Sequence, residues 1–400
     1  MTARTPVREL ARALDARDVD VAGRVVSAEA ASFTLQDDTG CVTVEAASVP
    51  QVGAFVRVRG RAEAGRIRSV AELVTVTPGS ERFTRADSDW GYLIGARLHN
   101  LRLRHALLRA SRAFFDAEGL LEVDTPAIVP CPGLDVHLDA IEVLGMRAPR
   151  WLHTSPEYQL KRLLTTGLPG IYEIGKAFRR GEKGRLHEPE FTMLEWYRTF
   201  SDAEQMQLDT ERLVSQAAQQ LLGSTRIPGV EHPVDVAPPW PRISVEQAFR
   251  RYASLSLDSV LHDEERFNRV LVEKIEPELG RGRPVFLTHY PARMASLARL
   301  CPEDPRFAER FEAYLDGVEL CNGFSELTDV EEQRKRFETD QETREKLGRS
   351  VYPIDERFMG ALSEGIPPSG GNALGFDRLL MLISGAKHID QVMGFAVARM

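Results

Sequence analysis

The sequence predicts an α+β protein that carries a small β-barrel at its amino-terminal end. Short apolar runs alternate with turn residues between Val19 and Val76, and helical patterns alternate with strand-like runs from about residue 97 onward. A series of short strands closes naturally into a barrel, whereas the later mixture is typical of a sheet covered by helices. No GxxxxGK[ST] segment is present, and no GxGxxG opens a helix after a strand, so neither P-loop nor Rossmann nucleotide binding is expected.

The barrel is predicted over residues 1–82 from runs that read as strands: VDVAGRVV, FTLQDDTG, CVTVEA, VGAFVRVRGRA and IRSVAELVTV. A DxxG turn closes the second run and Gly60 interrupts the fourth, and this order resembles an OB-fold. Pro78 and Gly79 then break the strand pattern. We therefore expect residues 83–96 to form a linker.

This barrel is poorly equipped to bind RNA. Residues 1–80 hold ten Arg against ten Asp plus Glu, and their only aromatic residues, Phe33 and Phe55, occupy positions that strand alternation would turn inward. Single-stranded RNA is usually bound by a positive groove with exposed stacking rings. The formal net charge of -8 is also the wrong sign for a protein that coats nucleic acid. A structural or partner-docking barrel is favoured, and anticodon binding remains the alternative.

The second domain is predicted over residues 97–400. Leu103, Leu107, Ala110 and Phe114 recur at helical spacing, which predicts an amphipathic helix over 97–118 that ends at Gly119. Further helical patterns cover about 203–222, 243–253, 264–278 and 329–346, with strand-like runs between them. No internal repeat or low-complexity tract interrupts this alternation.

Composition and cysteine usage indicate a cytoplasmic protein. The amino terminus is interrupted by charges every few residues, and no uninterrupted apolar stretch of about 18 residues follows, so neither a signal peptide nor a membrane span is predicted. The cysteines form no CxxC pair, which argues against a zinc knuckle and a dense disulfide framework. We expect buried free thiols at Cys41, Cys131, Cys301 and Cys321.

The chemistry is concentrated in residues 154–198, where apolar strand-like pieces frame a loop that is basic from Arg179 to Arg185. The planar guanidinium group of Arg binds phosphate oxygens through two donors and stays charged, so it suits the charge that develops on an α-phosphate. Such a loop can hold a triphosphate. Taken alone, it could equally be a solvated surface.

The segment resembles motif 2 of the class II aminoacyl-tRNA synthetases, in the form found in their lysine branch. EGLLEVDTP, ending at Pro126, resembles motif 1, and GGNALGFDRLLM, from Gly370, resembles motif 3. The three motifs occur in the correct order. The resemblance implies an antiparallel sheet flanked by helices, ATP as a substrate, and a homodimer whose interface motif 1 builds.

The resemblance also assigns nucleotide contacts. Arg179 would bind the α-phosphate and the substrate carboxylate, Phe191 would stack on one face of adenine, and Arg378 would cover the other. Arg185 and His187 would contact the outer phosphates. The alternatives are ordinary core packing for Phe191 and, for Arg378, a salt bridge with the aspartate that precedes it.

Two acidic residues resemble the magnesium-binding carboxylates of the family. Glu312 and Glu319 lie seven residues apart in RFEAYLDGVELCNGFSELTD, and Glu319 would also contact ATP. Magnesium takes oxygen ligands and shares them with phosphates, so two carboxylates and ATP can neutralise charge as pyrophosphate leaves. Because seven residues also span two helical turns, a solvated helix face is the alternative.

The amino-acid pocket implied by the resemblance is acidic. Glu157 would face the α-amino group, while Glu195, Glu326 and Tyr197 would surround the side-chain amine, with Asn322 between these elements. Buried carboxylates need a cationic partner, so three converging acids argue for a diamino acid.

Motif 3 discriminates further within the lysine branch. Ala373 stands where lysyl-tRNA synthetases carry Gly, and the added methyl narrows the pocket. A methyl-sized change is worth roughly 1 to 3 kcal/mol in selectivity. With GRLHEPEFTMLEWYR, this alanine makes the chain most similar to the ligases that attach (R)-β-lysine to a lysine of elongation factor P.

Two departures leave other functions open. The best-known members of that ligase family lack an amino-terminal barrel, which keeps tRNA charging by a lysyl-tRNA synthetase as an alternative. Motif 2 reads FRRGE where FRNE is usual, so Gly181 stands at the expected acid and Glu182 follows one place later. Glu182 would take over that role, or activation would be weaker. A catalytically idle paralogue that senses amino acid or binds RNA is the third possibility.

Overall fold

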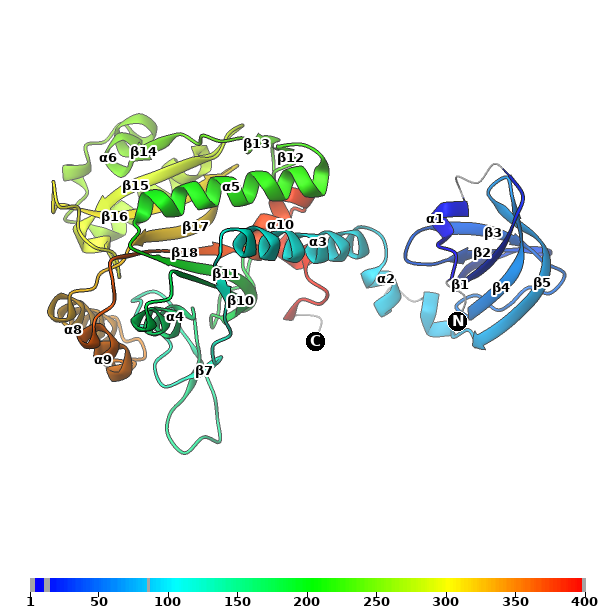
Figure 1. The fold of residues 1–400 in the computed structure, drawn as a ribbon, viewed down its shortest axis with the longest axis horizontal. Helices are drawn as coiled ribbons and strands as arrows, with labels where there is room; N and C mark the ends of the chain where they lie inside the picture. Colours follow the sequence, from blue (N-terminus) through cyan, green and yellow to red (C-terminus); the bar gives the residue numbers. More distant parts are fainter. Residues whose placement is uncertain (1–3, 11–14, 85–86, 398–400) are drawn as a thin grey trace. The chain divides into compact units, whose positions relative to one another are not determined.

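The computed structural model describes residues 4–10, 15–84 and 87–397. The chain divides into two compact units, residues 1–99 and residues 100–400 (Figure 1). Within the described residues, no helix is long and apolar enough to cross a membrane. The predicted linker over 83–96 falls partly on residues 85–86, outside the described part, and contains the short helix α2 (Asp89–Leu93).

The first unit is a closed barrel with strand order β1-β2-β3-β5-β4, which confirms the predicted five strands. Alternate residues of each strand point inward, because successive side chains lie on opposite faces. Val21, Phe33 and Val58 are among the fully buried residues of its core. The helix α1 precedes the strands, whose bounds are α1 Val7–Leu10, β1 Arg17–Ala28, β2 Ser32–Gln36, β3 Cys41–Glu45, β4 Phe55–Glu63 and β5 Arg66–Thr77.

The inward position predicted for Phe55 is wrong. Phe55 is 42% exposed, whereas Ala54 and Val56 on either side are each 1% exposed. The alternation of inward-facing and outward-facing residues is therefore shifted by one residue from the predicted one, and the ring of Phe55 faces outward. The guanidinium carbon of Arg24 lies 4.3 Å from its centroid, so the ring serves as the face of a cation–π contact.

The second unit is built on an eight-stranded sheet with strand order β14-β15-β16-β17-β18-β11-β10-β6. Its interior is antiparallel as expected, but the edge pairs β14–β15 and β6–β10 are parallel, so the sheet is mixed. The bounds are β6 Leu121–Glu122, β10 Gly170–Phe178, β11 Glu190–Thr199, β14 Arg242–Ser244, β15 Val285–Pro291, β16 Phe307–Leu315, β17 Val318–Ser325 and β18 Ser369–Gly375. The α+β class is confirmed.

Helices α3 (Ala96–Ala117), α5 (Ala203–Leu222) and α10 (Phe376–Ser384) cover one face of this sheet (Figure 1). Their apolar sides share one buried cluster with strand residues such as Trp196 and Leu374, both fully buried. The predicted helices over 97–118 and 203–222 are confirmed. Gly119 follows α3 with φ +75°, a left-handed conformation that glycine adopts without strain.

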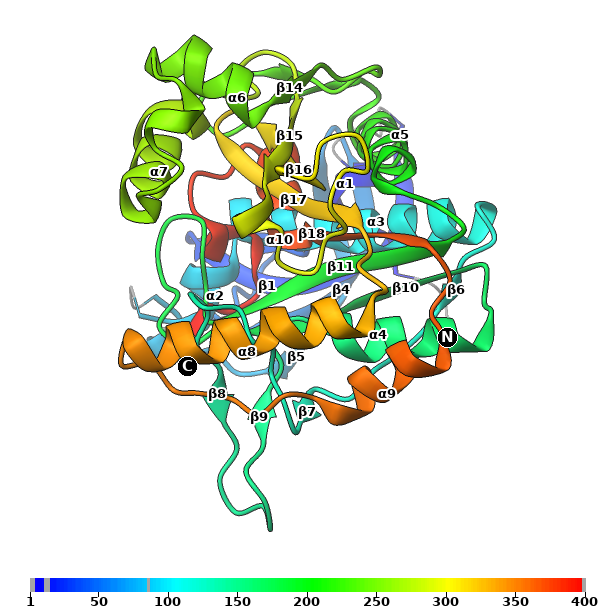
Figure 2. The ribbon, with the colours of Figure 1, turned by 90° about the vertical axis from the view of Figure 1, so that its left-hand side faces the viewer.

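Helices α4 (Glu157–Leu163), α8 (Val330–Lys346) and α9 (Glu356–Glu364) lie together on the other side of the sheet (Figure 2). They share a second cluster that includes Tyr158, Phe337 and Phe358 with Tyr197 of the sheet. The prediction of a helix over 329–346 is confirmed. A cavity lies on this side, and Tyr158 and Phe337 are among the residues that line it.

The remaining helical predictions are only partly regular helix. Residues 243–253 contain α6 (Val245–Ala248) followed by a π-helical turn, and residues 264–278 contain α7 (Glu264–Val270) followed by π and 3-10 turns. Small sheets complete the fold: β7 Ile128–Val129, β8 Ile141–Glu142 and β9 Trp151–Leu152, and β12 Arg226–Ile227 with β13 Val234–Asp235. The four cysteines are free, as predicted, but burial is confirmed only for Cys131, Cys301 and Cys321, because Cys41 is exposed.

Candidate active site

A row of polar side chains crosses the sheet on the face opposite α3, α5 and α10. Sheet pairing sets Glu173 of β10 opposite Glu195 of β11, Glu195 opposite Ala373 of β18, Ala373 opposite Asn322 of β17, and Asn322 opposite Glu312 of β16. Residues directly opposite in antiparallel strands point to the same face. Register thus aligns three of the predicted amino-acid residues with one predicted magnesium ligand, Glu312. Among the five residues of this row, the only apolar side chain is the methyl of Ala373.

Gly371 leaves room in the neighbouring row for two of the predicted residues. It is paired with Tyr197 on one side and Phe324 on the other. A Cβ at Gly371 would lie 2.2 Å from Glu326 Oε1 and 2.4 Å from a ring carbon of Tyr197. Only glycine therefore permits these two side chains to approach the strand.

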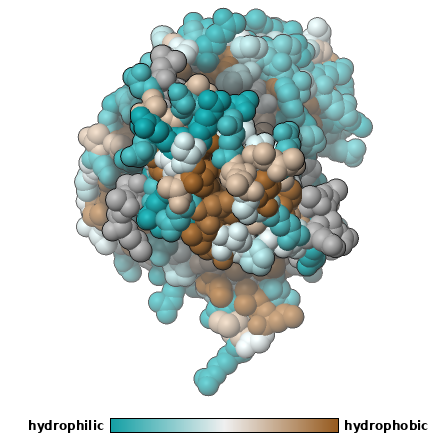
Figure 3. Space-filling model, turned by 90° about the vertical axis from the view of Figure 1, so that its right-hand side faces the viewer, coloured by the Kyte–Doolittle hydropathy of each residue, from teal (hydrophilic) through white to brown (hydrophobic). Residues whose placement is uncertain are grey.

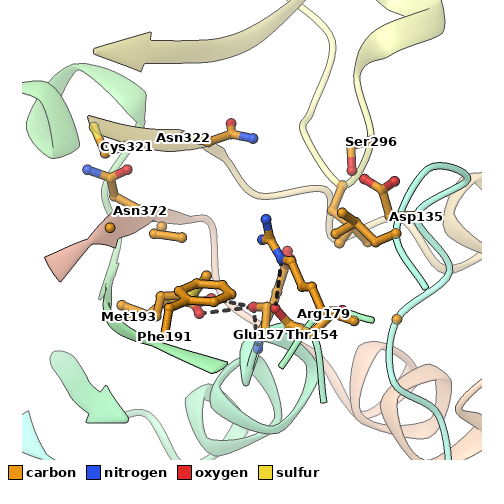
Figure 4. A pocket seen from close by; sticks show the side chains of 18 of the residues that line it. Asp135, Thr154, Glu157, Arg179, Phe191, Met193, Ser296, Cys321, Asn322 and Asn372 are labelled. Carbon is orange, nitrogen blue, oxygen red and sulfur yellow. Dashed lines mark hydrogen bonds between the residues drawn. The ribbon is translucent and has the colours of Figure 1, made fainter. Parts of the chain in front are cut away.

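Apart from Glu173, the row forms the floor of a cavity of about 380 Å³. In Figure 4, Asn322 and Asn372 lie on one side of it, Asp135 and Ser296 on the other, and Arg179 points into the space between. The structure brings most of the predicted site residues together here, namely Glu157, Arg179, Glu182, His187, Phe191, Glu195, Tyr197, Glu312, Glu319, Asn322, Ala373 and Arg378. Arg185 and Glu326 are not among the lining residues.

Arg179 follows β10 directly and turns over the cavity. Its Nε donates to the carbonyl oxygen of Thr154 at 3.5 Å (Figure 4), and its guanidinium carbon lies 5.1 Å from the ring centroid of Phe191. Phe191 is half-buried, packs against the core cluster and also lines the cavity. An arginine beside an aromatic face offers a nucleotide one group for phosphate and one for the base.

Gly181, which stands where motif 2 usually carries an acid, has a conformational reason. Gly181 has φ +82°, and a Cβ there would meet nothing within 4 Å. Glycine is therefore used for the left-handed turn and not for space. Glu182 lines the cavity with Oε2 3.8 Å from Arg179 Nη1, so an acid is present beside Arg179 despite the shift by one residue.

Arg378 faces the same cavity from the first turn of α10. It donates to the carbonyl oxygen of Glu319 at 2.8 Å, lies 3.3 Å from Glu319 Oε2, and places Nη2 2.7 Å from His187 Nε2. Burial and the positive charge of Arg378 lower the pKa of His187. The alternative of an Arg378–Asp377 salt bridge is wrong, because Asp377 is paired with Arg104 instead.

Arg185 stands apart from the other predicted nucleotide residues. Its side chain is 45% exposed, and its Nη1 lies 3.7 Å from Glu231 Oε1. It lies in the turn between β10 and β11 and does not line the cavity that Arg179 and Arg378 share.

Glu195 is the most enclosed acid of the amino-acid end. It is 2% exposed and accepts hydrogen bonds from Ser155 Oγ at 2.9 Å and Tyr197 Oη at 2.7 Å. Burial, followed by the negative charge of Glu157, raises its pKa to about 8. Burial also raises the pKa of Glu326 to about 8. Without a ligand, Glu195 therefore holds a proton at neutral pH, and a cation would displace it, whereas Glu326 already contacts the ammonium group of Lys161.

The sequence did not predict that a cation, Lys161, lies at the amino-acid end of the cavity. Lys161 Nζ lies 2.6 Å from Glu157 Oε1 and is also ion-paired with Glu326 Oε2. Glu326 thus lies against Lys161 and is next to Gly371, which lines the cavity. The i, i+4 spacing of Glu157 and Lys161 on α4 was a signal for part of this arrangement. The contact with Glu326 had no local signal.

Glu312 and Glu319 lie on the hairpin of β16 and β17, so the alternative of a helix face is wrong. Glu312 Oε1 accepts from Arg310 at 2.7 Å, and Oε2 accepts from Tyr290 at 2.5 Å and Tyr314 at 2.7 Å. Burial and the charge of Glu319 raise the pKa of Glu312. These donors hold the carboxylate rigidly, while Glu319 is 39% exposed toward the cavity.

A third acid near this hairpin was not predicted. Tyr314 Oη donates to Glu276 Oε1 at 3.2 Å, and burial together with the charges of Glu312 and Glu319 raises the pKa of Glu276 to about 7. Within residues 4–10, 15–84 and 87–397, no group of three or more His, Cys, Asp or Glu is arranged to hold a metal ion by itself. A cation here needs further oxygen ligands.

Residues 95–399 match the family model for class II tRNA synthetases specific for D, K and N, and the chain belongs to this family. It is an aminoacyl ligase of that family, which implies the use of ATP. Among curated proteins, it is similar to elongation factor P (R)-β-lysine ligases. That of Hamiltonella defensa is 40% identical over 333 residues, covering 76% of this chain and 97% of the relative.

Two further relatives carry the same name. The ligase of Edwardsiella ictaluri is 41% identical over 319 residues, and that of Yersinia enterocolitica is 41% identical over 321 residues. Each match covers 76% of this chain and 97% of the relative. Nearly the whole length of these relatives thus corresponds to about three quarters of this chain, and the family match begins at residue 95, after the barrel.

Proposed function

We propose that this protein uses ATP to activate (R)-β-lysine as an aminoacyl adenylate and transfers it to a lysine of elongation factor P. The observation that carries the proposal is a single cavity with arginines at one end and carboxylates at the other. A nucleotide triphosphate and a diamino acid match these two ends in charge. Relatives that the chain matches over 97% of their length carry this activity in their names.

The nucleotide end is assigned to Arg179, Phe191 and Arg378, with Glu182 and His187 beside them. The guanidinium groups of Arg179 and Arg378 face one cavity, so they can stabilise the charge that grows on the α-phosphate during attack. His187 accepts from Arg378 through Nε2, so it is neutral and can donate through Nδ1. Arg185 would have to swing inward from its present position to reach the outer phosphates.

Glu312 and Glu319 are proposed to hold Mg²⁺ together with ATP. The donor set fits, because both are carboxylates on adjacent strands and Mg²⁺ prefers oxygen ligands that it shares with phosphates. When bound, the ion would neutralise negative charge on the leaving pyrophosphate. The chain's own contribution is to hold Glu312 in place through Arg310, Tyr290 and Tyr314.

The amino-acid end is assigned to Glu157, Glu195, Tyr197, Asn322 and Glu326. Glu157 and Glu195 would each receive an ammonium group, and the substrate carboxylate would lie toward Arg179. Ala373 stands between Glu195 and Asn322 in the row that forms the floor, so its methyl decides how deep the carbon chain sits. This is where selection between α-lysine and β-lysine is proposed to occur.

Two steps then form the product. A carboxylate oxygen of the amino acid attacks the α-phosphorus of ATP, the bond to the bridging oxygen breaks, and pyrophosphate leaves. The neutral amine of an acceptor lysine next attacks the carbonyl carbon of the adenylate. An amide forms, AMP leaves with the electron pair of the mixed anhydride bond, and the amine proton passes to solvent or phosphate.

We also propose that the protein works as a cytoplasmic homodimer through the motif 1 region. Leu121 in β6 and Ile128 in β7 are 52% and 43% exposed. Exposed apolar side chains on neighbouring segments are typical of an interface. Light scattering coupled to size exclusion would give twice the chain mass if this is correct and the chain mass if it is not.

Charging of tRNA is the second candidate, and the extra barrel is the observation that favours it. Against it, arginines of the barrel are held in ion pairs, such as Arg57 with Asp20 at 2.5 Å and Arg59 with Glu72 at 2.9 Å. Figure 3 shows a face of the barrel on which an apolar patch is bordered by hydrophilic residues. Such a surface suits a protein partner better than a phosphate backbone.

One experiment tests the proposal and its alternatives. The protein is given ATP, Mg²⁺ and labelled α-lysine or (R)-β-lysine, with elongation factor P and lysine tRNA offered together. Label in elongation factor P, strongest with (R)-β-lysine, is expected. Label in tRNA alone would establish the synthetase alternative, and absence of pyrophosphate exchange with every diamino acid would leave only the idle paralogue.

A further inference from the structure

A buried lysine that no motif assigns lies beneath the acidic end of the cavity. Lys161 is 1% exposed, and its Nζ lies 2.6 Å from Glu157 Oε1 and in direct contact with Glu326 Oε2. The rings of Phe324 and Phe358 lie 5.1 and 6.0 Å from the same nitrogen. A buried ammonium group among apolar neighbours is stable only when anions compensate it.

Lys161 contacts one oxygen of each carboxylate, Oε1 of Glu157 and Oε2 of Glu326, and does not contact the other oxygen of either group. Both carboxylate oxygens of Glu326 are buried without a hydrogen-bond partner in the described part of the chain, but Oε2 is compensated by its ion pair with Lys161 and Oε1 is not. Oε1 lies on the side of Gly371, which lines the cavity, because a Cβ at Gly371 would come within 2.2 Å of it. A buried oxygen without a partner at the edge of a binding cavity is expected to accept from a ligand.

We propose that Lys161 is a built-in counterion that orients Glu157 and Glu326 and sets the charge of the amino-acid pocket. The proposal deepens the proposed function, because it rests on that function and explains the charge balance of the same site. When Glu157, Glu195 and Glu326 are ionised, their three negative charges and the single positive charge of Lys161 give the pocket two net negative charges. The two ammonium groups of a diamino acid balance these charges, and a monoamino acid does not.

The groups around Lys161 determine how its removal acts. Glu157 lies on its own helix and Glu326 follows β17, while Glu195 and Tyr197 belong to β11 next to them. The carboxylates outweigh burial and raise the pKa of Lys161, so it stays charged. Lys161 opposes the burial that raises the pKa of Glu326. Removing Lys161 therefore raises the pKa of Glu326 further.

The test compares Lys161→Met with the double variant Lys161→Met/Glu326→Gln by pyrophosphate exchange between pH 6.5 and 9. The single variant leaves three negative charges, and the double variant restores two. We expect the amino-acid KM of Lys161→Met at pH 7 to rise by about tenfold or more, and its pH midpoint to move up by about one unit. The KM for ATP should stay within about twofold. The double variant should recover the wild-type midpoint.

The control is Lys346→Met, which removes the same i, i+4 pair with Glu342 from an exposed position on α8, where the lysine side chain is 74% exposed. It should leave both KM values and the midpoint unchanged. A wild-type midpoint in Lys161→Met, or a double variant no closer to the wild type than the single one, would overturn the counterion role.

Thermal unfolding without substrate separates this inference from the proposed function. The Tm of Lys161→Met relative to wild type should fall as the pH rises through about 8 to 9, because Glu326 of the folded wild type, with a pKa of about 8, ionises there while Glu326 of the folded variant resists. The Tm of the double variant relative to wild type should not fall with pH in this way. A slope shared by both variants would contradict the inference even if exchange activity were normal. If Lys161→Met does not fold, a folded double variant supports the inference, and an unfolded one overturns it.

Discussion

Tyr197 Oη donates a hydrogen bond of 2.7 Å to Glu195 Oε1, and the two residues lie on the same face of β11. Together with Ser155, this donor holds the carboxyl in one orientation at the floor of the cavity. Burial nevertheless raises the pKa of Glu195 to about 8, since its surroundings contain acids and no cation of its own. The pocket is thus prepared for an ammonium group that the empty protein lacks.

The first prediction concerns pH. At pH 7 Glu195, with a pKa of about 8, is mostly protonated in the empty protein, and binding an ammonium group requires its anion. Affinity should therefore increase as the pH rises, and the amino-acid KM should fall about tenfold between pH 7 and 9 from this one proton. The KM for ATP, measured in the same exchange assay, should not follow this curve. A flat or rising amino-acid KM would refute the assignment.

Substitution of Glu195 should act on one substrate only. Glu195→Gln keeps the shape of the side chain but removes the charge that faces the amine. We expect kcat/KM for the amino acid to fall about 100-fold, since truncating a buried charge pair costs about 2 to 5 kcal/mol. Glu190→Gln, on the same strand but 42% exposed and paired with Lys176, is the control. Equal losses for ATP and the amino acid would remove Glu195 from the substrate contacts.

Ala373→Gly should change selectivity. The substitution deepens the floor between Glu195 and Asn322 by one methyl, so α-lysine should gain about tenfold relative to (R)-β-lysine in kcat/KM. Ala313→Gly removes a methyl from β16 within the core cluster on the opposite face and should not change the ratio. An unaltered ratio in Ala373→Gly as well would mean that motif 3 does not select the amino acid.

Gly371→Ala should destroy the amino-acid end while the nucleotide end survives. The new Cβ would lie 2.2 Å from Glu326 Oε1 and 2.4 Å from Tyr197, so one of these side chains must leave its position. Overpacking of this kind costs about 1 to 3 kcal/mol. We expect exchange to fall more than about 100-fold while ATP binding, followed by calorimetry, persists. Gly360→Ala in α9, where a Cβ would meet nothing within 4 Å, is the matched control.

Stability should depend on the buried pair of Arg104 and Asp377. Asp377 is 1% exposed, is ion-paired with Arg104, and accepts from the backbone N–H of Thr192 at 2.6 Å. Asp377→Ala leaves that donor and a half-buried guanidinium without their acceptor. The free energy of unfolding in urea should drop by about 3 to 5 kcal/mol. A loss below about 1 kcal/mol would show that water replaces the carboxylate.

Local patterns carried most of the fold. Alternation and turn residues located the barrel strands, and the 3.6-residue period located α3, α5 and α8 within about two residues, because both signals lie within one element. The predicted inward position of Phe55 was wrong, since alternation alone does not say which of two adjacent apolar residues points inward. The prediction of a regular helix over 264–278 was also wrong, because the part after α7 consists of π and 3-10 turns.

The sequence by itself determined the family of the chain, its barrel and α+β units, and the residue types that meet in the cavity. Those conclusions depend on motifs and periodicities that are continuous along the chain. Only the tertiary structure decided that Ala373 lies between Glu195 and Asn322 and that Glu326 faces Lys161. Sheet register and helix docking join segments that are far apart in sequence, and the charge of a buried site depends on every group that this packing brings together.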